Sequence, residues 1–184
     1  MLIILALAWG VARIFYLRRN GVSVLAVLGR RRSLVEWGSL FVAIIVDGYL
    51  ILRSVWPEVD SLVWATMHRL SPWGVLIMAM GIALAIVSQI AMGHSWRIGV
   101  PTERAPDQAL VTDGLHAFSR NPIYVGVMLF LIGSLILAPG PLTIGGTLAT
   151  WWLLRAIIRE EEAFLEREFG DAYRVYCARV RRWL

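Results

Sequence analysis

Long runs of apolar residues constrain the fold of this chain more than any other feature. A helix needs about 20 mostly apolar residues to cross the hydrocarbon core of a bilayer. Five runs in the sequence approach or reach that length, at residues 1–17, 34–56, 72–93, 122–138 and 141–158. They predict an all-α, polytopic membrane protein with about five transmembrane helices.

The composition agrees with a lipid-facing surface. Hydrophobic residues make up 58% of the chain, against roughly 45–50% in soluble domains. The net charge is +5, and all 18 basic residues are arginine because lysine is absent. These arginines cluster at the ends of the apolar runs, where they act as topology signals and headgroup contacts, so we expect no nucleic-acid binding. His94 and His116 are too far apart for a local ligand pair, and we expect no metal site.

The last two apolar runs are separated only by Pro139 and Gly140. Neither residue continues a helix readily. We therefore predict that these two runs form a tight antiparallel helical hairpin.

The arginines also predict an orientation. Five of them lie between the first two runs, whereas the next loop carries two, so the first loop should be cytoplasmic. Threading five helices from that anchor places the N-terminus outside, and residues 93–121 and the tail after residue 158 in the cytoplasm. Two features indicate a prokaryotic protein, and hence the inner (cell) membrane: every basic residue is arginine, and the predicted architecture has only about five helices.

Asp47 lies inside the second apolar run. A carboxylate at the bilayer centre costs roughly 2.5–3.5 kcal/mol on insertion scales. We expect it to face the bundle interior or a wet cavity, in either a structural hydrogen-bonding role or a substrate role.

Two polar clusters follow the third run. Residues 93–99 combine glycine, Trp96 and Arg97 at headgroup depth, which is a weak signal because such residues are common at interfaces. Asn121 before Pro122 predicts a capped helix start. With Arg120 beside it, this start favours an anionic group such as a carboxylate.

A third cluster follows the last apolar run, where Glu160, Glu161 and Glu162 are consecutive. Adjacent carboxylates repel one another, and neighbouring positions do not share a helix face. We expect at least one to turn inward, toward a cation or hydroxyl donors. The C-terminal segment after them should form a helical cytoplasmic tail.

The order of these clusters resembles a known family. Arg-x-Pro-x-Tyr-x-Gly at 120–126, an apolar hairpin, and Glu-Glu-x-x-Leu-x-x-x-Phe-Gly-x-x-Tyr-x-x-Tyr at 161–176 are similar to the isoprenylcysteine carboxyl methyltransferases. Phospholipid methyltransferases share part of this pattern. The resemblance covers about half the chain, from near Gly93 to the C-terminus.

The resemblance implies one membrane methyltransferase domain over residues 1–184, with N-terminal helices at 1–71 and the catalytic core and cofactor-binding tail at 72–184. It implies an S-adenosylmethionine pocket that faces the cytoplasm. Arg97 and Arg120 would hold the acceptor anion. The implied cofactor-binding residues are Val111, Gly114, Leu115, Asn121, Pro122, Tyr124, Glu161, Glu162, Tyr173 and Tyr176.

One departure from the family pattern concerns Asn121, where many members have histidine. An amide cannot be protonated at neutral pH, so a titrating role there is lost while hydrogen bonding survives. We expect the nearby His94 and His116 to be structural.

The predicted function is methyl transfer from S-adenosylmethionine to a lipophilic membrane acceptor, by carboxyl O-methylation of an isoprenylcysteine-like substrate. A carboxylate needs no general base, whereas an amine must first lose a proton. Three alternatives stay open: a phospholipid or amine N-methyltransferase, an NADPH-dependent membrane reductase, and a non-catalytic membrane interaction protein. The expected partners are a prenylated or other lipophilic acceptor and membrane lipids, with the oligomeric state left open.

Overall fold

The computed structural model describes residues 2–22, 34–62, 71–100, 103–105 and 108–184. Every regular element in these ranges is a helix, which confirms the all-α prediction. The helices are α1 (Leu2–Arg19), α2 (Leu34–Val55), α3 (Val59–Leu62), α4 (Pro72–Met92), α5 (Pro122–Leu137), α6 (Pro141–Phe169) and α7 (Asp171–Arg179), with 3₁₀ turns η2 (Gly93–Ser95) and η3 (Gly114–Ala117).

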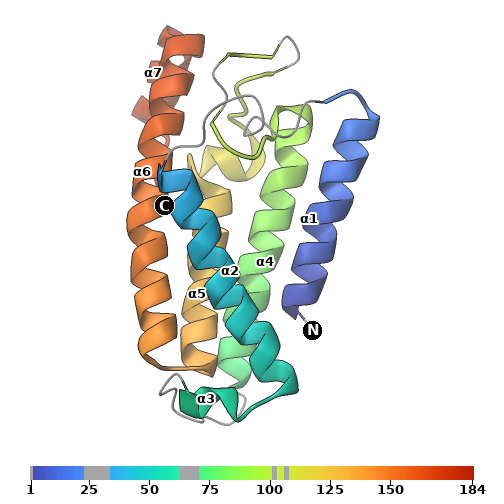
Figure 1. Cartoon of the computed structure of the whole chain (residues 1–184). Coiled ribbons are helices and arrows are strands. Elements are labelled where there is room, and N and C mark those ends of the chain that lie inside the picture. The colour runs from blue at the N-terminus through green and yellow to red at the C-terminus, as the bar shows by residue number, and fades with distance from the viewer. Residues whose placement is uncertain (1, 23–33, 63–70, 101–102, 106–107) are drawn as a thin grey trace.

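Five long helices, α1, α2, α4, α5 and α6, form one bundle (Figure 1). Each corresponds to one predicted apolar run. Proline at the first turn marks the starts of α4, α5 and α6, as its missing N–H and fixed φ favour. The end of α6 was predicted at residue 158, but the helix continues to Phe169 and stops at Gly170, whose φ is +51°.

Two helices, α2 and α4, are long and apolar enough to cross a membrane, and α5 is a shorter apolar helix. Only 17% of the apolar window of α2 or α4 is buried inside the protein, so most of that surface faces outward. The core helix of a soluble protein would bury this apolar surface, whereas a membrane helix can expose it to lipid. The count of five transmembrane helices stays a prediction.

Glycines bring α4 and α5 into backbone contact. A Cβ atom on Gly81 would lie 2.5 Å from the carbonyl oxygen of Gly126, and one on Gly133 would lie 2.6 Å from the amide nitrogen of Met78. Since neither distance admits a methyl group, only glycine permits this approach, as is common in membrane helix pairs.

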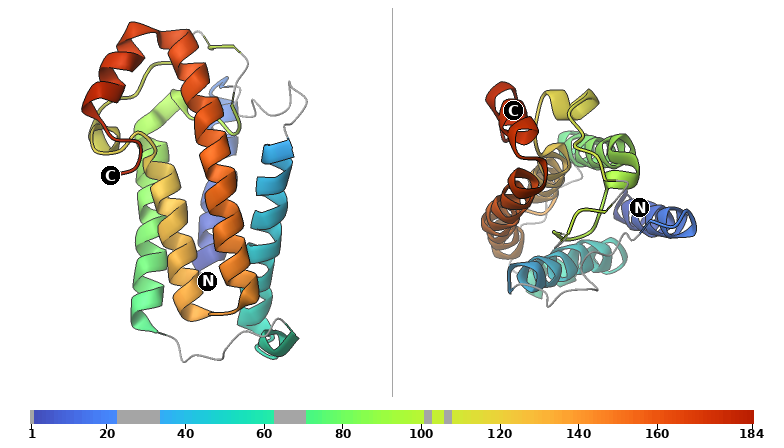
Figure 2. Two further views of the ribbon diagram at one scale, coloured as in Figure 1. Left: turned by 90° about the vertical axis from the view of Figure 1, so that its left-hand side faces the viewer. Right: turned by 90° about the horizontal axis from the view of Figure 1, so that it is seen from above.

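The predicted turn between α5 and α6 is present, and the two helices run antiparallel (Figure 2). Thr143 closes it by donating from Oγ1 to the carbonyls of Ala138 and Gly140, at 2.6 and 3.1 Å. The two helices nevertheless have different main partners, because α5 packs most extensively on α4 and α6 on α2.

A buried ion pair joins α2 to α3. Asp60 is 2% exposed and accepts hydrogen bonds from the Tyr49 hydroxyl at 2.9 Å and from Arg53 Nε at 2.7 and 2.8 Å. Burying a charge requires such pairing. This cluster therefore fixes the end of α2 opposite the site described below.

We expect Asp60→Ala to destabilise the protein by about 3 kcal/mol, because the partly buried Arg53 charge and the Tyr49 hydroxyl lose their acceptor. Tyr49→Phe removes one hydrogen bond and should cost about 1 kcal/mol. Thermal unfolding in detergent measures both. Equal melting temperatures for the Asp60→Ala variant and the unchanged protein would show that the pair contributes nothing to stability.

The polar segments gather at one end of the bundle (Figure 1). The described residues between 93 and 121, α7 and the C-terminal residues lie at the end where α1 finishes with Arg18 and Arg19, and the N-terminus lies at the other. Three of the five arginines used to predict the orientation, Arg30 to Arg32, lie outside the described residues.

Candidate functional site

A cavity of about 320 Å³ lies at this end of the bundle, within the roughly 300–1,000 Å³ typical of ligand sites. The end of α4, the segment before α5, the far end of α6 and α7 enclose it. Ten of the twelve residues predicted as site residues line it: Arg97, Val111, Arg120, Asn121, Pro122, Tyr124, Glu161, Glu162, Tyr173 and Tyr176.

Tyr124 and Glu161 join the two sequence motifs. The Tyr124 hydroxyl donates to Glu161 Oε1 at 2.7 Å. Glu161 lies beyond the apolar part of α6, and burial raises the pKa of its carboxyl to about 7. The neighbouring charges of Glu162 and Glu160 act in the same direction, and the hydrogen bond from Tyr124 opposes them. The charge of this carboxyl therefore changes near neutral pH.

Glu162 is held by two arginines. Arg182 donates from Nε to Oε1 at 2.9 Å and from Nη2 to Oε2 at 2.7 Å, while Arg120 Nη1 lies 3.3 Å from Oε1. Such two-pronged contacts fix a carboxylate in one orientation. Both Glu161 and Glu162 thus line the cavity, where at least one was expected.

Arg120 was predicted to bind the anionic group of the acceptor. Here its Nη1 pairs with Glu162 and also donates to the Cys177 thiol at 2.6 Å. Its Nε is buried and has no hydrogen-bond partner among the described residues.

The predicted side-chain cap at Asn121 is wrong. The helix begins at Pro122 as expected, but the Asn121 side chain caps nothing. Its Nδ2 donates instead to the carbonyl of Arg182 at 2.9 Å, and the Arg120 amide donates to the carbonyl of Arg181 at 2.9 Å. The Asn121 side chain therefore holds the C-terminal residues, and its oxygen accepts no hydrogen bond from the N–H groups at the start of α5.

Aromatic contacts complete this attachment. Trp183 stacks on Trp151 of α6 with ring centroids 5.0 Å apart. The Tyr176 hydroxyl donates to the carbonyl of His116 at 2.6 Å. The C-terminal residues therefore contact both α6 and the segment before α5, on either side of the cavity.

The structure does not bring Gly114 and Leu115 to the cavity wall. Gly114 is exposed, and its φ of +56° begins the turn η3. This turn directs His116 inward instead, with 6% exposure and a buried Nδ1 that has no partner among the described residues. We expected a structural role for His116, and no local pattern in the sequence signals the direction of its side chain.

Arg97 lines the cavity, and its Nη1 donates to the carbonyls of His94 and Trp96. Trp96, a further lining residue, is 7% exposed. Its sequence context suggested only an interfacial aromatic, so its place in the wall could not be predicted. Within the described ranges, no group of three or more His, Cys, Asp or Glu could hold a metal ion.

Comparisons with known proteins match this chain to methyltransferases. The sequence model of the phospholipid methyltransferase family matches residues 70–172. The protein-S-isoprenylcysteine O-methyltransferase of Xenopus laevis is 30% identical over 133 residues, which are 72% of this chain and 44% of that protein. The Rattus norvegicus protein of the same name is 32% identical over 126 residues, covering 68% and 43%.

A solved structure, that of a eukaryotic intramembrane Ras methyltransferase described as an isoprenylcysteine carboxyl methyltransferase, matches with a TM-score of 0.58 and 28% identity. The match covers 78% of this chain and 49% of the other. The chain spans less than half the length of the curated relatives named above.

The family match covers more than half of the 184 residues and includes the 120–126 motif and the acidic pair. The likeness to relatives named isoprenylcysteine methyltransferases confirms the resemblance seen in these motifs. The chain belongs to the phospholipid methyltransferase family.

Proposed function

We propose that the protein transfers a methyl group from S-adenosylmethionine to the carboxylate of a lipophilic, isoprenylcysteine-like acceptor. The observation that carries the proposal is the single cavity in which Tyr124 meets Glu161 and Arg120 meets Glu162. These pairs bring together motif halves that lie about 40 residues apart. The names of the relatives support the reaction class.

The cavity residues fit the cofactor. S-adenosylmethionine carries a carboxylate, an ammonium, a sulfonium, hydroxyl groups and an aromatic base. The buried Arg120 Nε and His116 Nδ1 are polar atoms in the wall that lack partners in the described structure, as expected where a polar ligand completes the site. Glu161 and Glu162 suit its cations and hydroxyls, and Trp96 and Tyr176 offer surfaces for its base.

When bound, the cofactor supplies an electrophilic methyl group. The residues of the chain then have mainly to position the acceptor, because a carboxylate is already a nucleophile at neutral pH. Arg97 and Arg120 would hold that anion, and Arg120 can exchange its contact with Glu162 for it. The C-terminal residues attached to Asn121 would exclude water.

A second candidate is N-methylation of a phospholipid amine. The description of the matching family favours it, and so does Glu161, since a carboxyl with a pKa of about 7 can act as a general base at neutral pH. The relatives named above are all methyltransferases, which gives an NADPH-dependent reductase no support from them.

We propose a bundle with five transmembrane helices, the N-terminus outside and the cavity facing the cytoplasm. The support is that α1, α5 and α6 lie alongside the two long apolar helices (Figure 2), and that the cavity shares its end of the bundle with Arg18 and Arg19. The absence of lysine supports the inner (cell) membrane of a prokaryote.

A transfer assay tests the reaction. Purified protein in nanodiscs receives S-adenosylmethionine with a tritiated methyl group and N-acetyl-S-farnesylcysteine, or a phosphatidylethanolamine in a parallel reaction. A methyl ester releases volatile methanol in base, whereas an N-methyl group does not. Base-volatile label from the farnesylcysteine supports the proposal. Base-stable label in the phospholipid alone would favour the second candidate.

Cofactor binding should depend on pH through Glu161. Its carboxyl is mainly protonated below pH 7 and anionic above it, since burial raises its pKa to about 7. A cation that lowers this pKa by about one unit binds about fivefold tighter at pH 8 than at pH 6. The affinity of S-adenosylmethionine relative to S-adenosylhomocysteine, which lacks the sulfonium, should therefore rise by that factor.

Isothermal titration calorimetry at both pH values measures this ratio, with Glu161→Gln as the control that cannot ionise. The ratio should not change with pH in that variant. A ratio that is also constant in the unchanged protein would show that Glu161 does not sense the sulfonium.

A further inference from the structure

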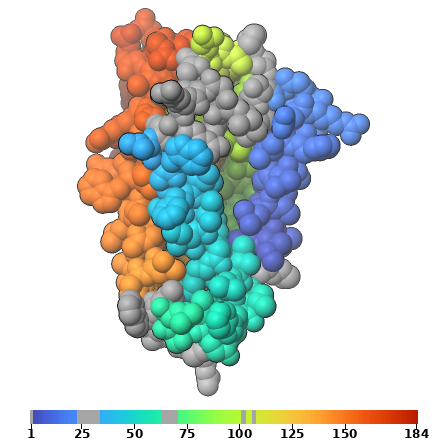
Figure 3. Space-filling view, in the orientation of Figure 1, coloured from blue at the N-terminus to red at the C-terminus, as the bar shows by residue number. Residues whose placement is uncertain are grey.

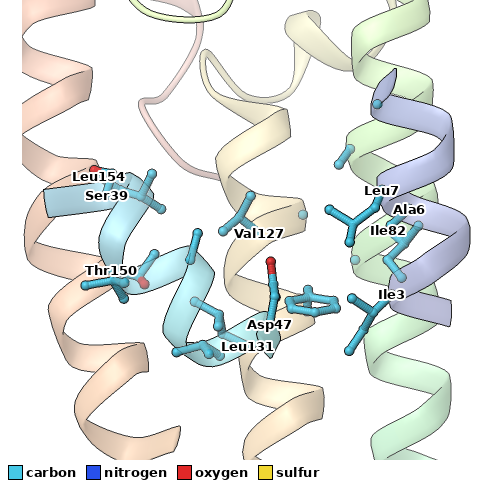
Figure 4. A pocket seen from close by; sticks show the side chains of 18 of the residues that line it. Ile3, Ala6, Leu7, Ser39, Asp47, Ile82, Val127, Leu131, Thr150 and Leu154 are labelled. Carbon is cyan, nitrogen blue, oxygen red and sulfur yellow. The ribbon is translucent and has the colours of Figure 1, made fainter. Parts of the chain in front are cut away.

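A second cavity, of about 340 Å³, lies inside the helix bundle between α1, α2, α4, α5 and α6 (Figure 4). Gln89 lines both this cavity and the one at the cofactor end, and its Oε1 accepts a hydrogen bond from Trp9 Nε1 at 2.9 Å. Gln89 therefore forms part of the wall between the two cavities. Between α1 and α2 the surface is open enough that α4 is seen behind them (Figure 3).

The wall of this bundle cavity is mainly apolar, with residues such as Leu7, Ile82 and Val127. Asp47 of α2 points into it among these side chains (Figure 4). Among the described residues, no hydrogen-bond or ion-pair partner contacts the Asp47 carboxyl, and none of those that line the cavity carries a positive charge. Ser39 also lines it, but its hydroxyl already donates to the carbonyl of Val35 at 2.8 Å.

A carboxyl in such apolar surroundings destabilises the protein unless a hydrogen-bond or ion-pair partner contacts it. At membrane depth a charged side chain is destabilising, and even a neutral polar group is destabilising there when it stays unpaired. A plain hydrocarbon in this cavity would displace water from the Asp47 carboxyl without forming a hydrogen bond to it. A hydrogen-bond donor would pair with the carboxylate oxygens, and also with the carbonyl oxygen of the protonated acid.

We propose that Asp47 narrows the isoprenylcysteine-like class: it favours an acceptor whose lipophilic part carries a hydrogen-bond donor, a hydroxyl or an ammonium group, over one with an unmodified isoprenyl chain. This inference rests on the proposed function, since it takes the bundle cavity as the place of the acceptor's apolar portion and the cavity beyond Gln89 as the place of its reacting end. α1 and α2 line much of it and precede the part of the chain that the family model matches. The preference for a hydrogen-bond donor would thus be a property of this chain rather than of the part that the family model matches.

Direct binding tests the inference without requiring turnover. Isothermal titration calorimetry of the full chain in detergent compares farnesol with farnesyl methyl ether, which keeps the oxygen but lacks the donor. We expect farnesol to bind about tenfold tighter. Asp47→Leu should abolish this preference, and Ser39→Ala, which removes a hydroxyl already bonded to the backbone, should retain it.

Farnesylamine distinguishes the two donors. If an ammonium is the natural partner, the amine binds tightest and Asp47→Asn removes its advantage, because the amide has no charge. If a hydroxyl is the partner, farnesol binds tightest and Asp47→Asn keeps most of its preference through the amide oxygen.

Titration of each variant with S-adenosylhomocysteine shows that the fold and the cofactor cavity are intact, and it separates the two proposals. Equal binding of farnesol and its ether, binding of neither, or a preference that survives Asp47→Leu would overturn the role of Asp47 even when S-adenosylhomocysteine binds. If the unchanged protein does not bind S-adenosylhomocysteine, that result would instead contradict the proposed methyltransferase.

Discussion

Replacing Glu162 with alanine is expected to weaken S-adenosylhomocysteine binding by about 30-fold. Loss of charged hydrogen bonds is worth about 2 kcal/mol, which corresponds to that factor. Two effects combine, because the cavity loses a carboxylate and the contacts to Arg120 and Arg182 disappear together. The second effect frees the C-terminal residues that enclose the cavity. Titration calorimetry of the detergent-purified variant measures the change.

Glu161→Ala should give a loss of similar size, since it removes the acceptor of the Tyr124 hydroxyl within the same wall. The adjacent Glu160→Ala is the matched control, because Glu160 does not line the cavity. Membrane insertion should be unchanged in all three variants. Wild-type affinity in both Glu161→Ala and Glu162→Ala would remove the acidic pair from the cofactor site.

Gly133→Ala is expected to destabilise the bundle by about 3 kcal/mol. The added methyl group would lie 2.6 Å from the amide nitrogen of Met78 and 2.7 Å from the carbonyl oxygen of Gly74. These are backbone atoms, so α4 and α5 must separate along their main contact, and overpacking of this kind costs roughly 1–3 kcal/mol or more. Thermal unfolding in detergent, followed by circular dichroism, measures the loss.

Gly145→Ala in α6 is the matched control, because nothing lies within 4 Å of the added methyl group. Alanine favours a helix over glycine by up to about 1 kcal/mol, so this variant should be as stable as the unchanged protein or slightly more stable. If Gly133→Ala and Gly145→Ala unfold at the same temperature, the close α4–α5 contact does not contribute to stability.

The helices could be predicted well because local signals mark them. Pro72, Pro122 and Pro141 each begin a helix at the predicted residue. The end of α6 could not be placed from hydropathy, since the residues after Ile158 are charged yet favour helix. Their helix continues past the apolar run until Gly170 adopts a positive φ.

The site was predictable as a set of residues but not as a set of contacts. The family resemblance implied that Tyr124 and Glu161 share a pocket, yet nothing local predicted the link from Glu162 to Arg182, 20 residues later. Asn121 has the right position for a helix cap, but its side chain is turned toward the C-terminal residues and donates to the carbonyl of Arg182, and its oxygen caps nothing. The direction of η3, which turns His116 inward, likewise depends on tertiary packing.

The most direct test of the proposed methyltransferase is calorimetric titration of the purified protein with S-adenosylhomocysteine, with NADPH titrated in parallel. We predict saturable binding of S-adenosylhomocysteine, about 30-fold weaker binding of it in Glu162→Ala, and no binding of NADPH. Binding of NADPH alone would contradict the account in favour of a reductase, and binding of neither compound would contradict it in favour of a non-catalytic membrane protein.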